Sequence, residues 1–234
     1  MNFKYSNQKT SEKKEVLEQK NMPTMPEIKA IKGPLQRAFQ NLLEEDDVKD
    51  FSKLLEISDA LNRSIIIEEI DEESGVVAEN LIRFWNRLDD EMKIPTTERQ
   101  PIKIYIDSPG GYINSTFTII DSIRLSKTPI WTINIGCAYS GGFFIFISGH
   151  KRIAYPLSSF LYHEGAATIG GDANKFQNQA DFYKNQRKKL KEITLKYTKI
   201  TEDLYNEHIK DDWWLFADEA KELGIVDEIA SEFI

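Results

Sequence analysis

The stretch GCAYSGGFFIF, residues 136–146, places one serine between a tyrosine and two glycines, directly before a run of large apolar residues. Such a stretch resembles a nucleophile elbow, in which a serine sits on a tight turn between a strand and a helix and glycines leave room around it. Gly142 fits that pattern, but Ala138 stands where the pattern has its first glycine. Ser140 is therefore a candidate nucleophile, and a small residue at a close packing contact is the alternative.

The chain on both sides of this stretch alternates between strand-like and helix-like patterns. The alternation indicates an α/β domain, in which ligands bind where strands end and loops begin. The expected strands and helices, from residue 64 to residue 164, are SIIIEEI (strand), VVAENLIRFWNRL (helix), IKIYIDSPGG (strand), 113–123 (helix), PIWTINIG (strand), FFIFI (helix), KRIAYP (strand) and SFLYHE (strand).

Residues 173–197 predict a long helix with a thin apolar seam on an otherwise polar surface. A seam of this kind is typically covered by a second helix, so it favours self-association. The basic run KNQRKKLK within it could be a docking patch, but the solvated face of a charged helix is the better interpretation. Thr201 is the expected N-cap of a further helix. WWLF, ADEAKELG and IVDEIA then predict a strand, a helix that stops at Gly224, and a strand.

The N-terminal region differs in composition from the rest. Residues 1–33 are polar and without periodicity, which predicts a flexible extension. Residues 34–61 carry apolar residues at helical steps, which predicts a short amphipathic helical segment. We expect residues 62–234 to form the main domain.

Composition narrows the classes of function. The net charge of −8 and the pI near 5.1 argue against binding to nucleic acid or to an anionic membrane. The sequence has no apolar run of membrane-spanning length and no signal-peptide pattern, so we expect a cytoplasmic protein. Cys137 is the sole cysteine, which excludes an intrachain disulfide and a cysteine-rich zinc site, and we expect it to be a small buried residue.

A serine nucleophile needs a base, and three histidines are available. His150 follows a glycine at the end of the FFIFI helix, where a turn-capping role is the preferred interpretation. His208 lies among charged residues and is expected to face solvent. His163 ends an apolar strand beside a loop, which is where a general base would sit, although a structural role is the alternative.

The orienting carboxylate and the oxyanion donors are less well marked. Asp211 and Asp212 precede WWLF, whose aromatic pair could bury an aspartate beside an imidazole, although a solvated loop aspartate is the default interpretation for either. For the oxyanion, SPGG suits a type II turn that would leave the N–H of Gly111 at a strand end, and the N–H of Gly141 follows the serine. An ordinary tight turn is the alternative for SPGG alone.

Taken together and in this order, five motifs resemble the proteolytic subunit of the Clp protease, the ClpP family. They are YIDSPGG, GCAYSGG, LYHEG, DDWWLFADEA and GIVDEI, and the resemblance covers residues 63–234.

This resemblance implies a ClpP/crotonase-like fold of repeated strand-strand-helix units with a protruding handle helix, assembled as rings. It implies Ser140 as nucleophile, His163 as base, Asp212 as orienting acid, and Gly111 and Gly141 as the oxyanion hole.

It further implies a self-compartmentalised serine endopeptidase of stacked, commonly heptameric rings that hydrolyses unfolded polypeptides. A hexameric AAA+ unfoldase would feed it and spend the ATP, so the subunit itself would need no metal and no cofactor. Extended substrate would lie beside Gly170 and Gly171.

The chain departs from the family pattern in three places: HEG stands where the family usually has HQP, Tyr139 replaces a small residue, and the N-terminal region is longer. These departures leave two alternatives. One is a ClpP-like scaffold or regulatory subunit with weak catalysis, and the other is an acyl-CoA enzyme of the crotonase type.

Overall fold

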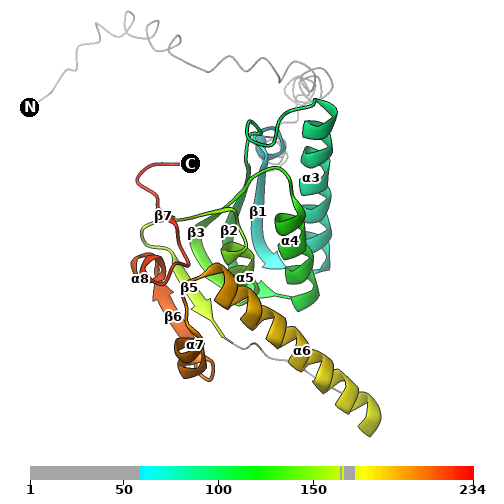
Figure 1. Ribbon diagram of the computed structural model, residues 1–234, viewed down its shortest axis with the longest axis vertical. Coiled ribbons are helices and arrows are strands. Elements are labelled where there is room, and N and C mark those ends of the chain that lie inside the picture. The colour runs from blue at the N-terminus through cyan, green and yellow to red at the C-terminus, as the bar shows by residue number, and fades with distance from the viewer. Residues whose placement is uncertain (1–57, 164, 166–171) are drawn as a thin grey trace, which may run out of the picture. The chain divides into compact units, whose positions relative to one another are not determined.

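The alternation of strands and helices expected from the sequence is confirmed in the computed structural model (Figure 1). The structure describes residues 58–163, 165 and 172–234. The proposed N-terminal extension, all but the end of the 34–61 segment, Gly170 and Gly171 lie outside the described residues. The elements are β1 Ser64–Ile70, α3 Glu72–Glu91, β2 Ile102–Gly111, α4 Ile113–Leu125, β3 Ile130–Tyr139, α5 Gly141–Ile147, β4 Lys151–Ala154, β5 Ser159–Tyr162, α6 Ala173–Tyr197, α7 Glu202–His208, β6 Trp213–Phe216, α8 Ala217–Glu222 and β7 Glu228–Ile229.

The strands form one seven-stranded sheet whose main path runs β1-β2-β3-β4-β7, all parallel. Every second residue of β2 is buried, and Ile102, Ile104 and Ile106 are fully enclosed. Their alternation places these isoleucines on one face of the sheet, where they join the main apolar core. The sheet thus provides the rigid frame on which the strand ends are held.

The sheet forks at β3, and this fork positions the candidate site. The first half of β3 pairs with β4 through residues 131–134, whereas its last three residues, 137–139, pair with β5. β5 then pairs with β6 in the antiparallel direction. The small antiparallel unit of β5 and β6 therefore lies beside the end of β3 that leads to Ser140.

Helices α3 and α4 pack against each other beside the sheet, and α5 packs against β2 and β3. All seven residues of α5 are buried, which explains why GGFFIFI is apolar on every side. The interpretation of FFIFI as a buried helix rather than a strand is confirmed. α3 begins at the N-cap Asp71, whose carboxylate accepts from the N–H of Ser74 in a capping box.

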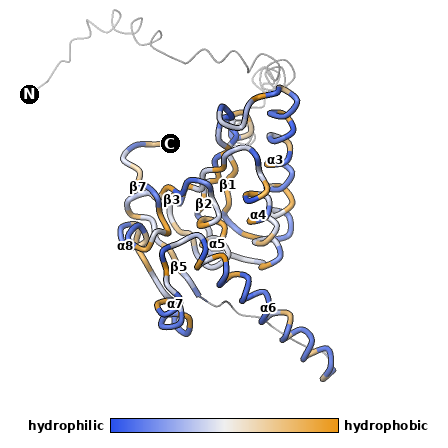
Figure 2. The backbone as a smooth tube through the Cα atoms, in the orientation of Figure 1, coloured by the Kyte–Doolittle hydropathy of each residue, from blue (hydrophilic) through white to orange (hydrophobic). Residues whose placement is uncertain are grey.

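α6 has the bounds expected from the sequence, and its two halves differ. The second half contributes Gln186, Leu190 and Thr194 to the interior, whereas residues 172–179 are all exposed. Figure 2 shows hydrophilic colour over most of α6 with isolated apolar positions along it. Phe176 and Phe182 lie in the first half of α6, and both are at least half exposed. The first half of α6 therefore presents exposed apolar rings at Phe176 and Phe182.

Candidate active site

Ser140 lies on a strained turn between β3 and α5. Its φ of 52° and ψ of −116° are unusual for a residue with a side chain, and backbone strain of this kind costs about 1–3 kcal/mol. The turn is held by the Ser140 N–H, which donates to the carbonyl of Leu161 at 2.9 Å. A sharp strand-to-helix turn that presents a serine is the geometry of a nucleophile elbow.

A glycine neighbour makes this turn possible. Gly110, at the end of β2, has a φ of +104°, and a Cβ on it would lie 2.7 Å from the Cβ of Ser140. That distance is shorter than any normal carbon contact, so a larger residue at 110 would displace the serine. The SPGG motif and the serine motif, far apart in sequence, thus fit together at one point.

His163 and Asp212 are brought together by strand pairing. β5 and β6 pair Leu161 with Trp214, and residues two positions apart in a strand share a face. Continuing the ladder by two residues places His163 opposite Asp212. Their Nδ1 and Oδ1 atoms are 3.7 Å apart, which is an ion-pair distance but longer than a hydrogen bond. Hydrogen bonds of catalytic groups are often long in the absence of substrate.

The carboxylate of Asp212 is 59% exposed, which agrees with the default interpretation of a solvated aspartate, and the tryptophan pair does not bury it. The reason is the direction of the neighbouring rings. Trp214, on the same face of β6, is itself 55% exposed, whereas Trp213 points to the other face and stacks on His208. Asp212 nevertheless faces His163 as the motif comparison implied.

The other ring nitrogen of His163 has an unmet hydrogen-bonding capacity. Its Nε2 atom is buried and has no hydrogen-bond partner within the described part of the chain. Buried polar atoms in folded proteins are almost always paired, so an exception calls for a functional explanation. A base that accepts the proton of a nucleophile has this requirement, because its accepting nitrogen must be available to the reacting hydroxyl.

The two candidate oxyanion donors lie close to each other. A Cβ on Gly141 would lie 3.5 Å from the amide nitrogen of Gly111, and a Cβ on Gly110 would lie 3.0 Å from the amide nitrogen of Gly141. Both N–H groups therefore belong to the immediate surroundings of Ser140. Two backbone donors beside a serine can stabilise the charge of a tetrahedral intermediate.

The type II turn expected for SPGG is wrong, because β2 continues as a strand through Gly111. Pairing with β1, which aligns Glu69 with Gly110 and Ile70 with Gly111 after an irregularity in the register, keeps this segment in the sheet despite the positive φ of Gly110. A Cβ on Gly111 would lie 2.0 Å from the carbonyl oxygen of Ile70, so the close approach of the two strands requires glycine. Contacts between strands have thus overridden the local turn preference.

The other two histidines have structural contacts. The backbone N–H of His150 donates to the carbonyl of Ile130 at 2.9 Å. The backbone N–H of Ile130 in turn donates to the ring Nδ1 of His150 at 3.0 Å. His150 therefore holds the start of β3 through Ile130, and the expected role of its side chain in capping a turn is not what the contacts show. His208 was expected to face solvent, but it is half-buried because its ring stacks on Trp213, with centroids 4.1 Å apart.

Cys137 is half-buried rather than fully buried as expected. Its backbone N–H donates to Oδ1 of Asp107 at 3.0 Å. Partial burial, followed by the nearby carboxylate of Asp107, raises the pKa of the thiol to about 11. A thiol with this pKa is protonated at neutral pH, which argues against a cysteine nucleophile.

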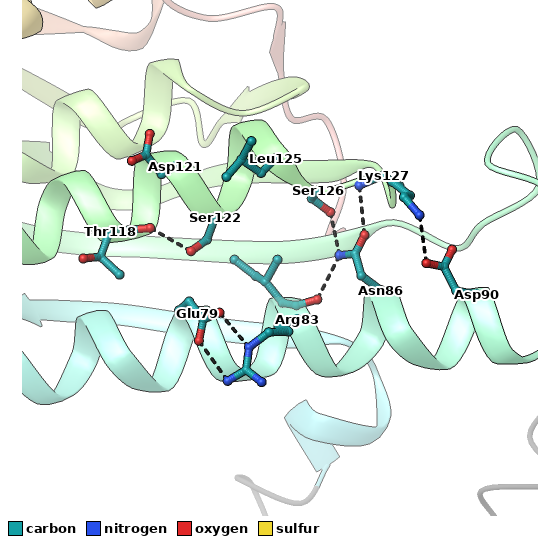
Figure 3. A pocket seen from close by; sticks show the side chains of 11 residues that line it. Glu79, Arg83, Asn86, Asp90, Thr118, Asp121, Ser122, Leu125, Ser126 and Lys127 are labelled. Atoms are coloured by element: carbon teal, nitrogen blue, oxygen red, sulfur yellow. Dashed lines mark hydrogen bonds and ion pairs between the residues drawn. The ribbon is translucent and has the colours of Figure 1, made fainter.

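A separate groove of about 470 Å³ lies between α3 and α4 (Figure 3). Asn86 bridges the two helices there: its Nδ2 donates to Oγ of Ser126, and its Oδ1 accepts the N–H of Lys127. The groove contains serines but no histidine lines it. It therefore lacks the pairing of nucleophile and base found around Ser140.

Two further observations concern ions and membranes. Within residues 58–163, 165 and 172–234, no three histidine, cysteine or acidic side chains gather closely enough to hold a metal ion. None of the helices in the same ranges combines the length and the apolar character needed to cross a bilayer.

The sequence patterns did not predict two contacts that support the site from neighbouring strands. The carbonyl of Leu161 holds the Ser140 turn, and the rings of Tyr139 and Trp214 meet edge to face. The available signal was strand alternation, because Leu161 and Trp214 stand two residues from His163 and Asp212, respectively. Glu164, Gly170 and Gly171, which adjoin the site in sequence, lie outside the described residues.

Comparison with known proteins gives a consistent result. The family model described as Clp protease matches residues 52–233. Similar proteins include the ATP-dependent Clp protease proteolytic subunit 2 of Tropheryma whipplei, 35% identical over 136 residues, which are 57% of this chain and 76% of that protein. The protein of the same name from Treponema denticola is 34% identical over 133 residues, 56% of this chain and 66% of that protein. Proteolytic subunit 1 of Streptomyces avermitilis is 33% identical over 133 residues, 56% of this chain and 61% of that protein. The match with the family model, which covers well over half of the sequence, shows that this chain belongs to the Clp protease family.

Proposed function

We propose that this chain is a serine endopeptidase of the Clp type that hydrolyses unfolded polypeptides through an acyl-enzyme. One observation carries the proposal: a serine held in a strained strand-to-helix turn adjoins the strand that ends in a histidine and aspartate pair. The proposed roles are nucleophile for Ser140, general base for His163 and orienting acid for Asp212.

In the proposed reaction, the hydroxyl of Ser140 attacks the substrate carbonyl while Nε2 of His163 takes its proton. The negative oxygen that forms accepts hydrogen bonds from the N–H groups of Gly111 and Gly141. The protonated imidazole then gives its proton to the leaving amine, and the C–N bond breaks. Water, deprotonated by the same imidazole, releases the acid product and restores the serine. Asp212 holds the N–H at Nδ1 and stabilises the imidazolium.

We place this activity in an oligomer that works with a Clp ATPase. The names of the relatives describe ATP-dependent proteolytic subunits, and the exposed rings of Phe176 and Phe182 on α6 fit a contact between copies of the chain. Stacked heptameric rings fed by an AAA+ unfoldase are the finer proposal, with ATP used by the partner and no cofactor in this subunit. We propose a cytoplasmic location, and substrate extended beside Gly170 and Gly171.

The test is labelling by a fluorophosphonate probe, which reacts with activated serines. We expect the parent chain to be labelled and Ser140→Ala not to be. Ser122→Ala, which changes a serine in the groove between α3 and α4, is the matched control and should be labelled like the parent. Light scattering after size exclusion, on the same samples, reports whether the particle has the mass of a ring.

An intact particle that resists labelling would overturn the peptidase proposal for the isolated protein and favour the scaffold alternative. The distance of 3.7 Å between Nδ1 of His163 and Oδ1 of Asp212, which is too long for a hydrogen bond, would then support weak catalysis. Binding of a CoA thioester by such a particle would favour the crotonase-type alternative.

A further inference from the structure

A row of three residues crosses the fork of the sheet beside the candidate site. Strand pairing aligns Tyr139 of β3 with Leu161 of β5, and Leu161 with Trp214 of β6. Paired residues in neighbouring strands point to the same face, so the three side chains project on the side opposite Phe160 and Leu215 of the core. His163 and Asp212 stand two residues from Leu161 and Trp214 and therefore share that face.

Tyr139 links all three strands of this row. Its ring meets the ring of Trp214 edge to face, with centroids 5.1 Å apart and an angle of 82° between planes. Its hydroxyl shares a hydrogen bond of 2.7 Å with Oγ of Ser159 on β5. Leu161, which stands between them in the strand ladder, is only 7% exposed. The residue directly before the nucleophile is thus attached to both strands that carry its partners.

The strand that begins directly after Asp212 is a short one at the edge of the described sheet. β6 has four residues, and among the described strands it pairs with β5 alone. Asp212 lies just before it, and its exposed carboxylate approaches Nδ1 of His163 at 3.7 Å. Short edge strands are held weakly by their ladder, so a side-chain contact that reaches β3 restrains where Asp212 lies.

We propose that Tyr139 and Trp214 are positioning residues that hold Asp212 against His163. The inference rests on the proposed peptidase function and adds to it the means by which the acid is kept in place. Neither ring is assigned a contact with substrate. The ring of Trp214 is 55% exposed, so it contributes little to the core, and its effect is expected on the site rather than on folding.

The experiment compares Trp214→Ala, Tyr139→Ala and Tyr139→Phe with the parent, each alone and combined with Asp212→Asn. The readouts are kcat/KM on a fluorogenic peptide and the melting temperature. We expect a loss of about 10- to 100-fold in kcat/KM for the two alanine variants, because small misplacements of catalytic groups have effects of this size. Tyr139→Phe keeps the ring contact and should retain most of the activity.

The combination with Asp212→Asn separates positioning from general damage. If the rings act through Asp212, their loss has little further effect once that carboxylate is gone, so the double variants should be no worse than Asp212→Asn by more than about threefold. Full additivity of the losses would overturn the inference, as would parental activity in both alanine variants.

Crystal structures of the parent and Trp214→Ala give a readout that does not depend on activity. We expect the Nδ1–Oδ1 distance between His163 and Asp212 to lengthen in the variant, and an unchanged distance would overturn the inference. A parent protein without peptidase activity would overturn the proposed function, and the distance would still decide whether the rings position the aspartate. The two failures are therefore distinguishable.

Discussion

The two ends of β3 each lie beside a histidine, and the two histidines differ in how their ring nitrogens are used. At the start of the strand, His150 exchanges two hydrogen bonds with Ile130, one of them through Nδ1. Beyond the other end, His163 keeps a buried Nε2 without a partner in the described residues and approaches Asp212 at a distance too long for a hydrogen bond. A ring nitrogen of His150 is therefore hydrogen-bonded within the fold, whereas a buried ring nitrogen of His163 has no hydrogen-bond partner among the described residues.

This difference separates a structural histidine from a candidate base without reference to motifs. A satisfied nitrogen supports backbone geometry, and removing it leaves a donor unpaired. A buried nitrogen that the fold leaves unpaired lowers stability and persists where a function needs it. The following variants test this contrast, from the largest expected effect to the smallest.

Replacing each histidine by alanine should give opposite results. His163→Ala should lower kcat/KM by at least about 10³-fold, as expected when a catalytic base is lost, with little change in melting temperature. His150→Ala should keep activity within a few-fold but lose about 1–2 kcal/mol of stability, because the Ile130 N–H loses its acceptor. Peptidase assays and thermal melts on both variants check this. Equal losses of activity would contradict the contrast.

The adjacent aspartates provide a second matched pair. Asp212→Asn should lower kcat/KM by about 10³–10⁴-fold, because an amide cannot hold the imidazole in the required tautomer or stabilise its charge. Asp211→Asn, one position outside the row that faces His163, should remain within about threefold of the parent. Steady-state kinetics on a peptide substrate measure both, and a larger effect at Asp211 would reassign the acid.

Two glycines test the packing at the two ends of the strand. A Cβ on Gly110 would lie 2.7 Å from that of Ser140, and one on Gly149 would lie 2.3 Å from Oγ1 of Thr132. Both alanine variants are overpacked and should lose about 1–3 kcal/mol of stability. Gly110→Ala should also slow fluorophosphonate labelling by at least tenfold, whereas Gly149→Ala should be labelled at the parental rate. Equal labelling rates would show that Gly110 does not control the serine.

The smallest expected effect is a dependence of stability on pH. Partial burial of its ring, followed by the positive charge of Arg124, lowers the pKa of His150 below its usual value of about 6.5. The unfolded chain then binds more protons than the folded one between the two pKa values, so the stability due to neutral His150 is complete above about pH 6.5 and is lost as the pH falls through the folded pKa. The parent should therefore exceed His150→Asn in melting temperature by more at pH 7.5 than at pH 5. A constant difference would contradict this assignment.

The sequence predicts the elements well where the pattern is local. The alternation in β2, the apolar run of α5 and the N-cap Thr201 all depend on near neighbours, and each is present in the structure. The expectation that failed for SPGG depends on pairing with β1, a segment about 40 residues away, which no local turn preference contains.

The candidate site shows the same division. The motifs bring Ser140, His163 and Asp212 forward as a set, but the contact of the Ser140 turn with β5 depends on the fork of β3, and the pairing of His163 with Asp212 depends on the register of β5 with β6. Stacking of His208 on Trp213 and the partial exposure of Cys137 also follow from tertiary contacts. Strand register is not encoded in any single segment, so the ring contact of Tyr139 with Trp214 could not be predicted.

The strained backbone at Ser140 sets the stability of this turn against its chemistry. Glycine adopts a positive φ without the steric penalty of a side chain, so the sequence most compatible with this turn is one that lacks the reactive hydroxyl. Selection for thermal stability alone would therefore favour Ser140→Gly and inactivate the protein. A screen for variants of higher thermal stability must keep serine at position 140, because stability and activity favour different amino acids there.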